Sequence, residues 1–388
     1  MALLKIRKNI RERMSAMGLP RHPEHAHILL SGFVEGQAGY QDPFTGPTST
    51  NINLSGAALD AYILGPSEWI SSLISLNYDD NSGTSEGSLN NNSRSQNSRV
   101  YVSQAFVTLG NFQLSPLYGT FGQYYVPFGT YSSNMVSSPL TKILGRIQAR
   151  AILLGYQPQL QNTWYASTYI FRGDSHAAST SRVNNGGINL GYRFGHGLIS
   201  SDVGMGVVAN IADSIGMQNN GFGLPYFGGF GGSATTNSGT GNEQLVHRVP
   251  AYDLRALLSF GDHINLVGEF VTASTSFNPN DLRMNGHGAK PRALNAEAAY
   301  TFEAFNKPSS IAAGYGMSKD ALAIGLPAKR YSLVLNTSWW KDTLQSLEFR
   351  HDIDYAASNT ANGSNAATPI AGTGKSDNLV TLQFDVYF

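Results

Sequence analysis

A run of polar residues between positions 142 and 150 is the first place where side chains of this sequence could do chemistry. One face of an extended chain there would carry Lys142, Arg146, Gln148 and Arg150, since successive side chains of a strand point to opposite sides. Ammonium and guanidinium groups bind anions, and the planar guanidinium suits two-point contacts with a carboxylate. The spacing therefore predicts a ladder of cations that would attract anionic solutes.

Two further arginines and a set of carboxylates fall on the polar faces of other predicted strands. Arg193 lies on one of them, and Arg255 lies beside Asp253 on another. The acidic residues on polar faces are Glu35, Glu269, Glu297, Glu348, Asp352 and Asp354. A basic wall facing an acidic wall would create a transverse field that favours anions along one side. Alternatively, neighbours such as Asp253 and Arg255 pair with each other and only keep the interior wet.

The elements that would position these side chains are strands with one apolar and one polar face. The last ten residues show this most plainly, with Val380, Leu382, Phe384, Val386 and Phe388 on one side and Thr381, Gln383, Asp385 and Tyr387 on the other. A terminal strand of this kind that ends on Phe is typical of the strand that closes an outer-membrane barrel. The rest of the chain can be tested against that expectation.

Composition agrees with alternating strands. Only 13% of residues are charged, while the 388 residues include 42 Gly, 19 Tyr and 19 Phe, and the mean hydropathy is −0.19. Lipid-facing and lumen-facing residues cancel in such an average. No stretch reaches the roughly 20 apolar residues of a membrane-spanning helix. The absence of cysteine excludes thiol-based sites, and the net charge of zero argues against nucleic acid as a partner.

Turn signals divide the chain into about sixteen predicted strands joined alternately by short turns and long loops. The short turns are predicted at Gly65-Pro66-Ser67, Gly110-Asn111, Gln157-Pro158-Gln159, Gly195-His196-Gly197, Gly261-Asp262, Asn306-Lys307-Pro308 and Trp340-Lys341-Asp342. The long loops are predicted at 41–49, 79–98, 131–139, 174–185, 213–244, 276–288, 318–326 and 356–376. This alternation is that of an outer-membrane barrel with both termini on the periplasmic side.

The predicted fold is therefore all-β, a transmembrane antiparallel β-barrel that is porin-like and has no plug domain. Residues 27–388 form the barrel in this prediction. Residues 1–26 form a short amphipathic periplasmic segment, in which Leu3, Ile6, Ile10, Met14 and Met17 recur at helical spacing. The expected location is the bacterial outer membrane, with its lipid and lipopolysaccharide as partners.

A Gly-rich segment at 216–241 is long for an ordinary connection, and loops of that length are commonly functional. It could fold inward and constrict the pore through Phe222, Tyr226, Phe227 and Phe230. The alternative is a surface loop.

Catalysis is not expected. The Gly-rich segment lacks the Lys-Ser/Thr ending of a phosphate-binding loop. His351 falls on a strand face assigned to lipid, and no Ser, His and Asp set converges on one strand face. The sequence therefore predicts no enzyme, no metal site and no cofactor.

Several segments resemble the LbtU family of outer-membrane siderophore receptors. They are 28–40, 53–60, 102–110 and 118–131, the last of which, YGTFGQYYVPFGTY, is the most distinctive. The resemblance extends over the barrel from about residue 27 to 388, and it implies a sixteen-stranded barrel that takes up a ferric siderophore without a plug domain. Family members carry a longer periplasmic extension than residues 1–26, so the resemblance says nothing of that extension's role here.

The expected function is thus uptake of an anionic ferric siderophore, of the polycarboxylate type, along the basic wall of Lys142, Arg146, Arg150, Arg193 and Arg255. Two alternatives remain open. A general or carbohydrate diffusion porin would show the same strands, and so would a structural or adhesive surface barrel.

Overall fold

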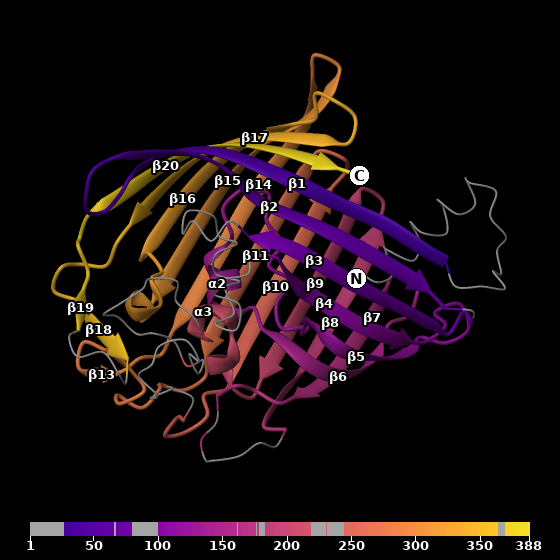
Figure 1. Ribbon diagram of the computed structural model, residues 1–388, viewed down its shortest axis with the longest axis horizontal. Coiled ribbons are helices and arrows are strands. Elements are labelled where there is room, and N and C mark those ends of the chain that lie inside the picture. The colour runs from indigo at the N-terminus through magenta and orange to yellow at the C-terminus, as the bar shows by residue number, and fades with distance from the viewer. Residues whose placement is uncertain are drawn as a thin grey trace.

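Alternating apolar and polar side chains give sixteen long strands that close into one antiparallel barrel (Figure 1). The structure is a computed structural model that describes residues 27–65, 67–79, 100–160, 162–175, 177, 183–218, 230, 244–363 and 369–388. The barrel strands are β1 (His27–Asp42), β2 (Ser49–Leu64), β3 (Ile70–Asp79), β4 (Val100–Leu109), β5 (Leu117–Tyr125), β6 (Gln148–Tyr156), β7 (Thr163–Phe171), β8 (Asn185–His196), β9 (Ile199–Val208), β10 (Ala251–Phe260), β11 (Ile264–Ala273), β14 (Arg292–Ala304), β15 (Lys307–Lys319), β16 (Lys329–Thr337), β17 (Thr343–Ile353) and β20 (Ser376–Tyr387). The predicted fold class is confirmed. The predicted segment 1–26 lies outside the described residues.

Most connections alternate in length as predicted; the exception is the β1–β2 connection, residues 43–48, which was predicted as a long loop and is no longer than the β6–β7 connection, residues 157–162. The seven predicted turns fall between successive strand pairs from β2–β3 to β16–β17, and they define the short-turn rim of the barrel. The other connections define the long-loop rim. Phe388 exchanges two backbone hydrogen bonds with Gly32, at 2.9 and 3.1 Å, and β20 pairs with β1 to close the ring at the short-turn rim.

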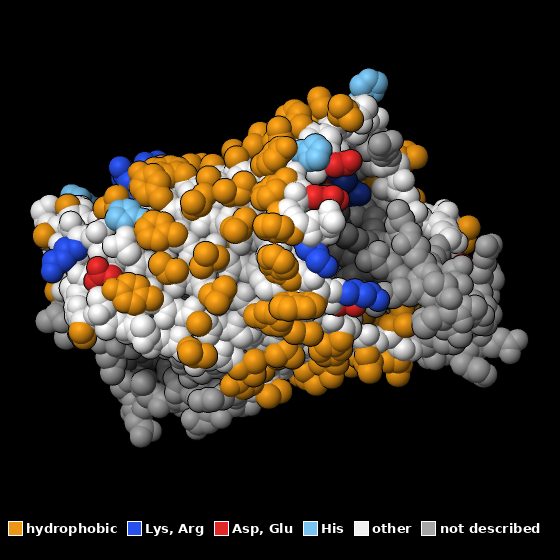
Figure 2. Space-filling view, turned by 90° about the horizontal axis from the view of Figure 1, so that it is seen from above, with side chains coloured by type: hydrophobic (Ala, Val, Ile, Leu, Met, Phe, Trp, Pro, Cys, Tyr) orange, Lys and Arg blue, Asp and Glu red, His pale blue; other side chains and the backbone are white. Residues whose placement is uncertain are grey.

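The two faces of the strands separate as the sequence predicts. On β20, Val380, Leu382 and Phe384 are 38%, 54% and 40% exposed, whereas Thr381 and Asp385 are buried toward the lumen. Figure 2 shows hydrophobic side chains spread over the visible wall, with charged side chains mainly toward its two ends. In the described part of the chain, no helix has the length and apolar character to cross a membrane.

Short elements from the long loops fill part of the interior. The helices are α2 (Leu140–Gly145), η3 (Ile211–Asp213), α3 (Ile215–Gln218) and η4 (Leu322–Ile324), and a small sheet contains β12 (Leu282–Met284), β13 (His287–Gly288), β18 (Thr360–Gly363) and β19 (Ile370–Ala371). Both α2 and α3 are drawn within the ring of strands (Figure 1), and α2 contacts β11, β14 and β15. Phe128, Leu144 and Met217 are fully buried, so a packed apolar cluster lies inside the barrel.

Candidate functional site: the constriction of the lumen

The connection between β5 and β6, residues 126–147, crosses the lumen, and we call it the crossing loop. Its two ends meet at the barrel wall, where the Val126 N–H donates to the Ile147 carbonyl at 3.0 Å. Its middle includes α2 and reaches strands β11 to β17. These strands lie across the ring from β5 and β6 in the strand order. The loop therefore narrows the channel from within.

Glu269 on β11 fixes the first part of the crossing loop. Its Oε1 accepts the backbone N–H groups of Thr130 at 2.8 Å and Tyr131 at 3.2 Å, and its Oε2 accepts the Thr141 hydroxyl at 2.9 Å. Tyr131 has a left-handed backbone with φ of 52°, which a bulky residue rarely adopts. A buried carboxylate thus stabilises a strained turn through charge-assisted hydrogen bonds.

Two more glutamates fix the middle of the crossing loop. Glu297 on β14 accepts the Asn134 N–H at 2.7 Å and the Ser133 hydroxyl at 2.7 Å. Glu348 on β17 accepts the N–H groups of residues 136 and 137, at 2.5 and 3.0 Å. All three glutamates were predicted to face the lumen, and they do. Their contacts show that they hold the loop against the wall.

An ion-pair cluster beside Glu348 completes the attachment. Arg330 on β16 makes a two-point contact with Asp352 on β17, at 2.8 and 3.0 Å, and donates to the Ser138 carbonyl at 3.0 Å. Arg350 lies 3.3 Å from the same carboxylate and donates to the Ser137 hydroxyl at 3.1 Å. These arginines bind the loop backbone and Asp352 together.

Arg193 and Arg255 face the lumen as predicted, in a neighbouring polar network on β7 to β10. Arg255 is 6% exposed, binds Asp253 at 2.7 Å and also donates to Asn189. Arg193 lies over the ring of Tyr165 at 4.8 Å, and its Nε is 3.9 Å from a carboxylate oxygen of residue 202. Arg255 is therefore paired with a carboxylate, which is the alternative that the sequence left open for Asp253 and Arg255, whereas the Nε of Arg193 makes no hydrogen bond among the described residues.

The other three residues of the predicted basic wall are not on the lumen face of a strand. Lys142 is part of α2 and donates to the Ser138 hydroxyl at 2.7 Å. Arg146 follows α2 and lies over the ring of Tyr125 at 4.5 Å. Arg150 is on β6, but it shares the outward face with Ile152, which is 58% exposed. The prediction of one cation ladder was wrong, because β6 begins only at Gln148 and its even positions face outward.

The remaining predicted residues lie in three different places. Glu35 faces the lumen on β1 and accepts the Ser55 hydroxyl at 2.5 Å. Asp354 follows the end of β17 and accepts the backbone and hydroxyl of Thr373, each at 2.7 Å, so it stabilises a long loop and does not line a wall. His351 lies on the outward face, as predicted, and its Nδ1 is 2.7 Å from the Asn378 Oδ1.

The predicted constriction by the Gly-rich segment is supported only at one residue. Phe230 is fully buried and stacks on Phe277 with ring centroids 5.3 Å apart, and its N–H donates to the Met217 carbonyl. It is thus a packing residue. Phe222, Tyr226 and Phe227 lie outside the described residues. The crossing loop, which the sequence suggested only as a connection, forms the constriction that the structure describes.

The wall that the crossing loop leaves uncovered has a distinct charge. Strands β1 to β5 and β20 contain no lysine and no arginine. Their described lumen-facing acids are Glu35, Asp60, Asp377 and Asp385. Amides and hydroxyls accompany them: Gln41 donates to Asp377 at 2.7 Å, and Gln383 donates to Asp385 at 3.0 Å. This part of the lumen wall is negative. Among the described residues, no group of three or more His, Asp or Glu could hold a metal ion.

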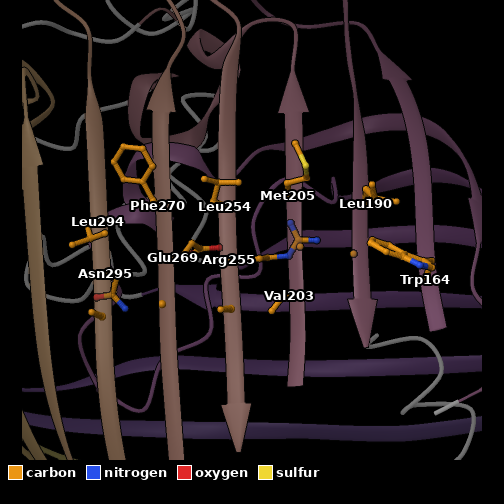
Figure 3. Close-up of a pocket in the computed structure, with 15 residues that line it drawn as sticks. Trp164, Leu190, Val203, Met205, Leu254, Arg255, Glu269, Phe270, Leu294 and Asn295 are labelled. Atoms are coloured by element: carbon orange, nitrogen blue, oxygen red, sulfur yellow. The ribbon is translucent and has the colours of Figure 1, made fainter. Parts of the chain in front are cut away.

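A shallow hollow on the outer face lies behind the arginine network. Figure 3 shows Leu254, Met205, Phe270 and Leu294 around it, with Trp164 at one edge, and its volume is about 520 Å³. Most of its lining side chains are apolar and lie on the outward face of the strands, and the lumen-side residues Arg255, Glu269 and Asn295 border it from behind. The hollow is therefore part of the lipid-facing surface and not of the solute path.

Solved structures with the same architecture are bacterial outer-membrane channels. The channel DcaP of Acinetobacter baumannii has a TM-score of 0.54 at 14% identity, covering 94% of this chain and 98% of that one. An anion-selective porin from Comamonas acidovorans gives 0.55 at 12%, over 94% and 100%, and OprB of Pseudomonas putida gives 0.57 at 9%, over 97% and 96%. The chain therefore shares the fold of these porin-like barrels.

Sequence comparison identifies the particular family. A UPF0422 protein of Coxiella burnetii is 38% identical over 390 residues, which are 100% of this chain and 77% of that protein. A UPF0422 protein of Legionella pneumophila (strain Philadelphia 1) is 40% identical over 393 residues, covering 100% of this chain and 71% of that protein. The chain belongs to the UPF0422 family. No protein-family model matches the sequence.

Proposed function

We propose that this porin-like outer-membrane protein is a diffusion channel for small polar solutes, with a preference for cations. The observation that carries the proposal is the crossing loop, which Glu269, Glu297 and Glu348 hold across the lumen from three different strands. A loop fixed in this way narrows the pore, and its hydrogen-bonded carboxylates keep the geometry of the constriction rigid, which supports a channel of defined width.

The charge preference follows from the side chains that face the part of the lumen beside the crossing loop. The wall of β1 to β5 and β20 offers carboxylates, amides and hydroxyls and no Lys or Arg. On the other wall, Arg255 is paired with Asp253, and Arg330 with Asp352. Rings of carboxylates favour cations in a pore because the local potential raises their concentration. The passage should therefore admit cations and neutral polar molecules more readily than anions.

Uptake of an anionic ferric siderophore is the second candidate. Its support is the resemblance at 102–110 and 118–131 to the siderophore receptors, together with the inward direction of Arg193 and Arg255. We place it second because Arg255 already has a hydrogen-bonded carboxylate partner, which leaves Arg193 with only a distant carboxylate beside it. A binding wall for polycarboxylate chelates needs cations with free hydrogen-bonding capacity.

Single-channel recording in a planar bilayer tests both candidates. We expect an open conductance. In a tenfold KCl gradient, the reversal potential should have the sign that K⁺ produces when it permeates more readily than Cl⁻. The double variant Glu35→Gln/Asp385→Asn should reduce this preference, because both residues belong to the uncovered wall and face the lumen. Asp262→Asn is the matched control, since Asp262 lies exposed in the β10–β11 turn.

Three other outcomes would redirect the proposal. Selective block by a polycarboxylate siderophore in its ferric form, and not in its iron-free form, would favour the second candidate. A preference for anions in the parent protein would contradict the argument from the acidic wall. Complete absence of current from a correctly folded barrel would support a structural or adhesive role.

A further inference from the structure

Three cationic side chains lie on neighbouring strands at the long-loop rim. We call Arg292, Lys319 and Lys329 the rim cation strip. Arg292 begins β14, Lys319 ends β15 and Lys329 begins β16. Arg292 and Lys319 are direct partners in the strand register, and Lys329 pairs with Met317, two residues before Lys319. Since paired strands lie about 5 Å apart, the three positive charges are crowded.

The strip faces outward, away from the lumen. On β15, Lys319 lies on the same strand face as Ile311, which is 43% exposed. On β16, Lys329 lies on the same face as Leu333, which is 49% exposed. Both lysines are themselves exposed. Immediately below them on the same face, the rings of Tyr315 and Tyr331 lie with centroids 5.3 Å apart. Tyrosines gather at the level of lipid headgroups, so the strip lies at the membrane interface.

The charges of the strip are not compensated within the described part of the chain. No ion pair there involves Arg292, Lys319 or Lys329, and the Arg292 Nε is buried without a hydrogen-bond partner. The adjacent Asp320 accepts the backbone N–H of Lys290 at 3.2 Å, and the side chain of Lys290 is exposed. Like charges directly opposite on paired strands destabilise a sheet unless an anion lies between them.

We propose that the rim cation strip binds phosphate groups of lipid A, the anionic lipid portion of lipopolysaccharide. The long-loop rim of a bacterial barrel faces the cell exterior, where that lipid forms the outer leaflet. A guanidinium makes two-point contacts with phosphate, and ammonium groups add compact charge. The apolar wall below the strip gives the acyl chains a surface, which a free phosphate would not need.

A neighbouring hollow extends the strip along the rim. Lys329 pairs in register with Ile353 of β17, and Ile353 lines a hollow of about 640 Å³ together with His351 and Lys375. The hollow therefore begins one strand away from the strip. Its lining also includes Asp42, Thr45 and Ser376, whose polar groups suit the sugar portion of the same lipid, and Lys375 is a fourth cation in the lining.

Binding of purified bisphosphorylated lipid A to the detergent-solubilised full chain tests the proposal. We expect Lys319→Gln/Lys329→Gln to bind lipid A at least about tenfold more weakly than the parent protein, since each cation near a lipid headgroup contributes to binding. Arg150→Gln is the matched control, because Arg150 is another exposed outward cation but lies on β6, away from the strip. Its affinity should equal that of the parent.

Further measurements distinguish binding of the lipid from binding of a free anion, and a loss of binding from a loss of folding. Lipid A without phosphate should bind the parent and the double variant equally weakly, and millimolar inorganic phosphate should not displace bisphosphorylated lipid A. Heat-modifiable migration on gels verifies that each variant is a closed barrel. Equal lipid A affinity of the parent and a folded double variant would overturn the proposal, and displacement by inorganic phosphate would overturn its choice of ligand.

Discussion

At the scale of single residues, Glu269 has the largest consequence for the pore. Its carboxylate accepts three hydrogen bonds from the crossing loop, and an amide could accept only at one of its two atoms. We expect Glu269→Gln to lower the free energy of unfolding by about 1–3 kcal/mol, the usual effect of leaving buried donors unpaired. Thermal unfolding and single-channel noise would both report it, with noisier and larger currents from a loosened loop.

Glu303 provides the control for that variant. It lies near the short-turn end of β14 and is exposed, far along the strand from the loop. Glu303→Gln should unfold like the parent. If the two glutamine variants behave alike, the carboxylate of Glu269 does not hold the loop.

Asp213, in the β9–β10 loop outside the membrane-spanning strands, makes stability depend on pH. Burial raises the pKa of Asp213 from 3.8 to about 6, although the carboxylate accepts the Ser175 N–H at 2.8 Å and the Asn185 amide at 2.6 Å. Because the folded loop then binds more protons than the unfolded chain, this contribution is complete below pH 3.8 and is lost as the pH rises through about 6.

Hydrogen exchange at the Ser175 amide would measure this dependence. After correction for the intrinsic exchange rate, protection should be greater at pH 5 than at pH 7. Asp213→Asn cannot ionise, so its protection should be the same at both values. Equal protection in the parent protein would mean that the carboxyl group is ionised throughout this range.

The sequence predicted the direction of most lumen side chains, but not their partners. Glu35, Glu269, Arg193 and Arg255 face inward because the period-two pattern of their strands is clear. Arg150 was misplaced because its strand was extended back through residues that form α2, and a wrong start assigns the wrong face.

At the scale of elements, the crossing loop marks the limit of sequence reasoning. All seven short turns follow from Gly, Pro, Asn and Asp signals that act locally. The inward course of residues 126–147 depends on glutamates more than a hundred positions later in the chain. The available signal was the joint presence of isolated glutamates on lumen-facing strand positions and a loop rich in Ser and Asn at 132–138.

A substitution at Gly316 on β15 tests how closely α2 packs against the barrel wall. A Cβ atom there would lie 3.2 Å from the Leu140 Cδ1, so a larger side chain must push the helix off the wall. We expect Gly316→Leu to lower the thermal midpoint and to change the single-channel conductance. Gly268→Leu is the matched control, because a Cβ at Gly268 meets nothing within 4 Å. Parent-like conductance in Gly316→Leu would show that α2 does not shape the pore.

At the scale of the whole molecule, closure depends on Gly32. A Cβ at this position would lie 2.3 Å from the Ala58 carbonyl oxygen and 2.6 Å from the ring of Phe388. Gly32→Val should therefore weaken the β1–β20 seam and reduce the fraction of protein that shows heat-modifiable migration. Gly36→Ala on the same strand should not, since its nearest atom would be 4.0 Å away. A parent-like fraction for Gly32→Val would contradict this role of the seam.

The anchoring of the crossing loop also ties its position to strand register. If β11, β14 or β17 paired one residue out of register, its glutamate would point toward lipid and the loop N–H groups would lose an acceptor. The hydrogen bonds of one loop thus depend on the correct alignment of three strands on the far side of the barrel.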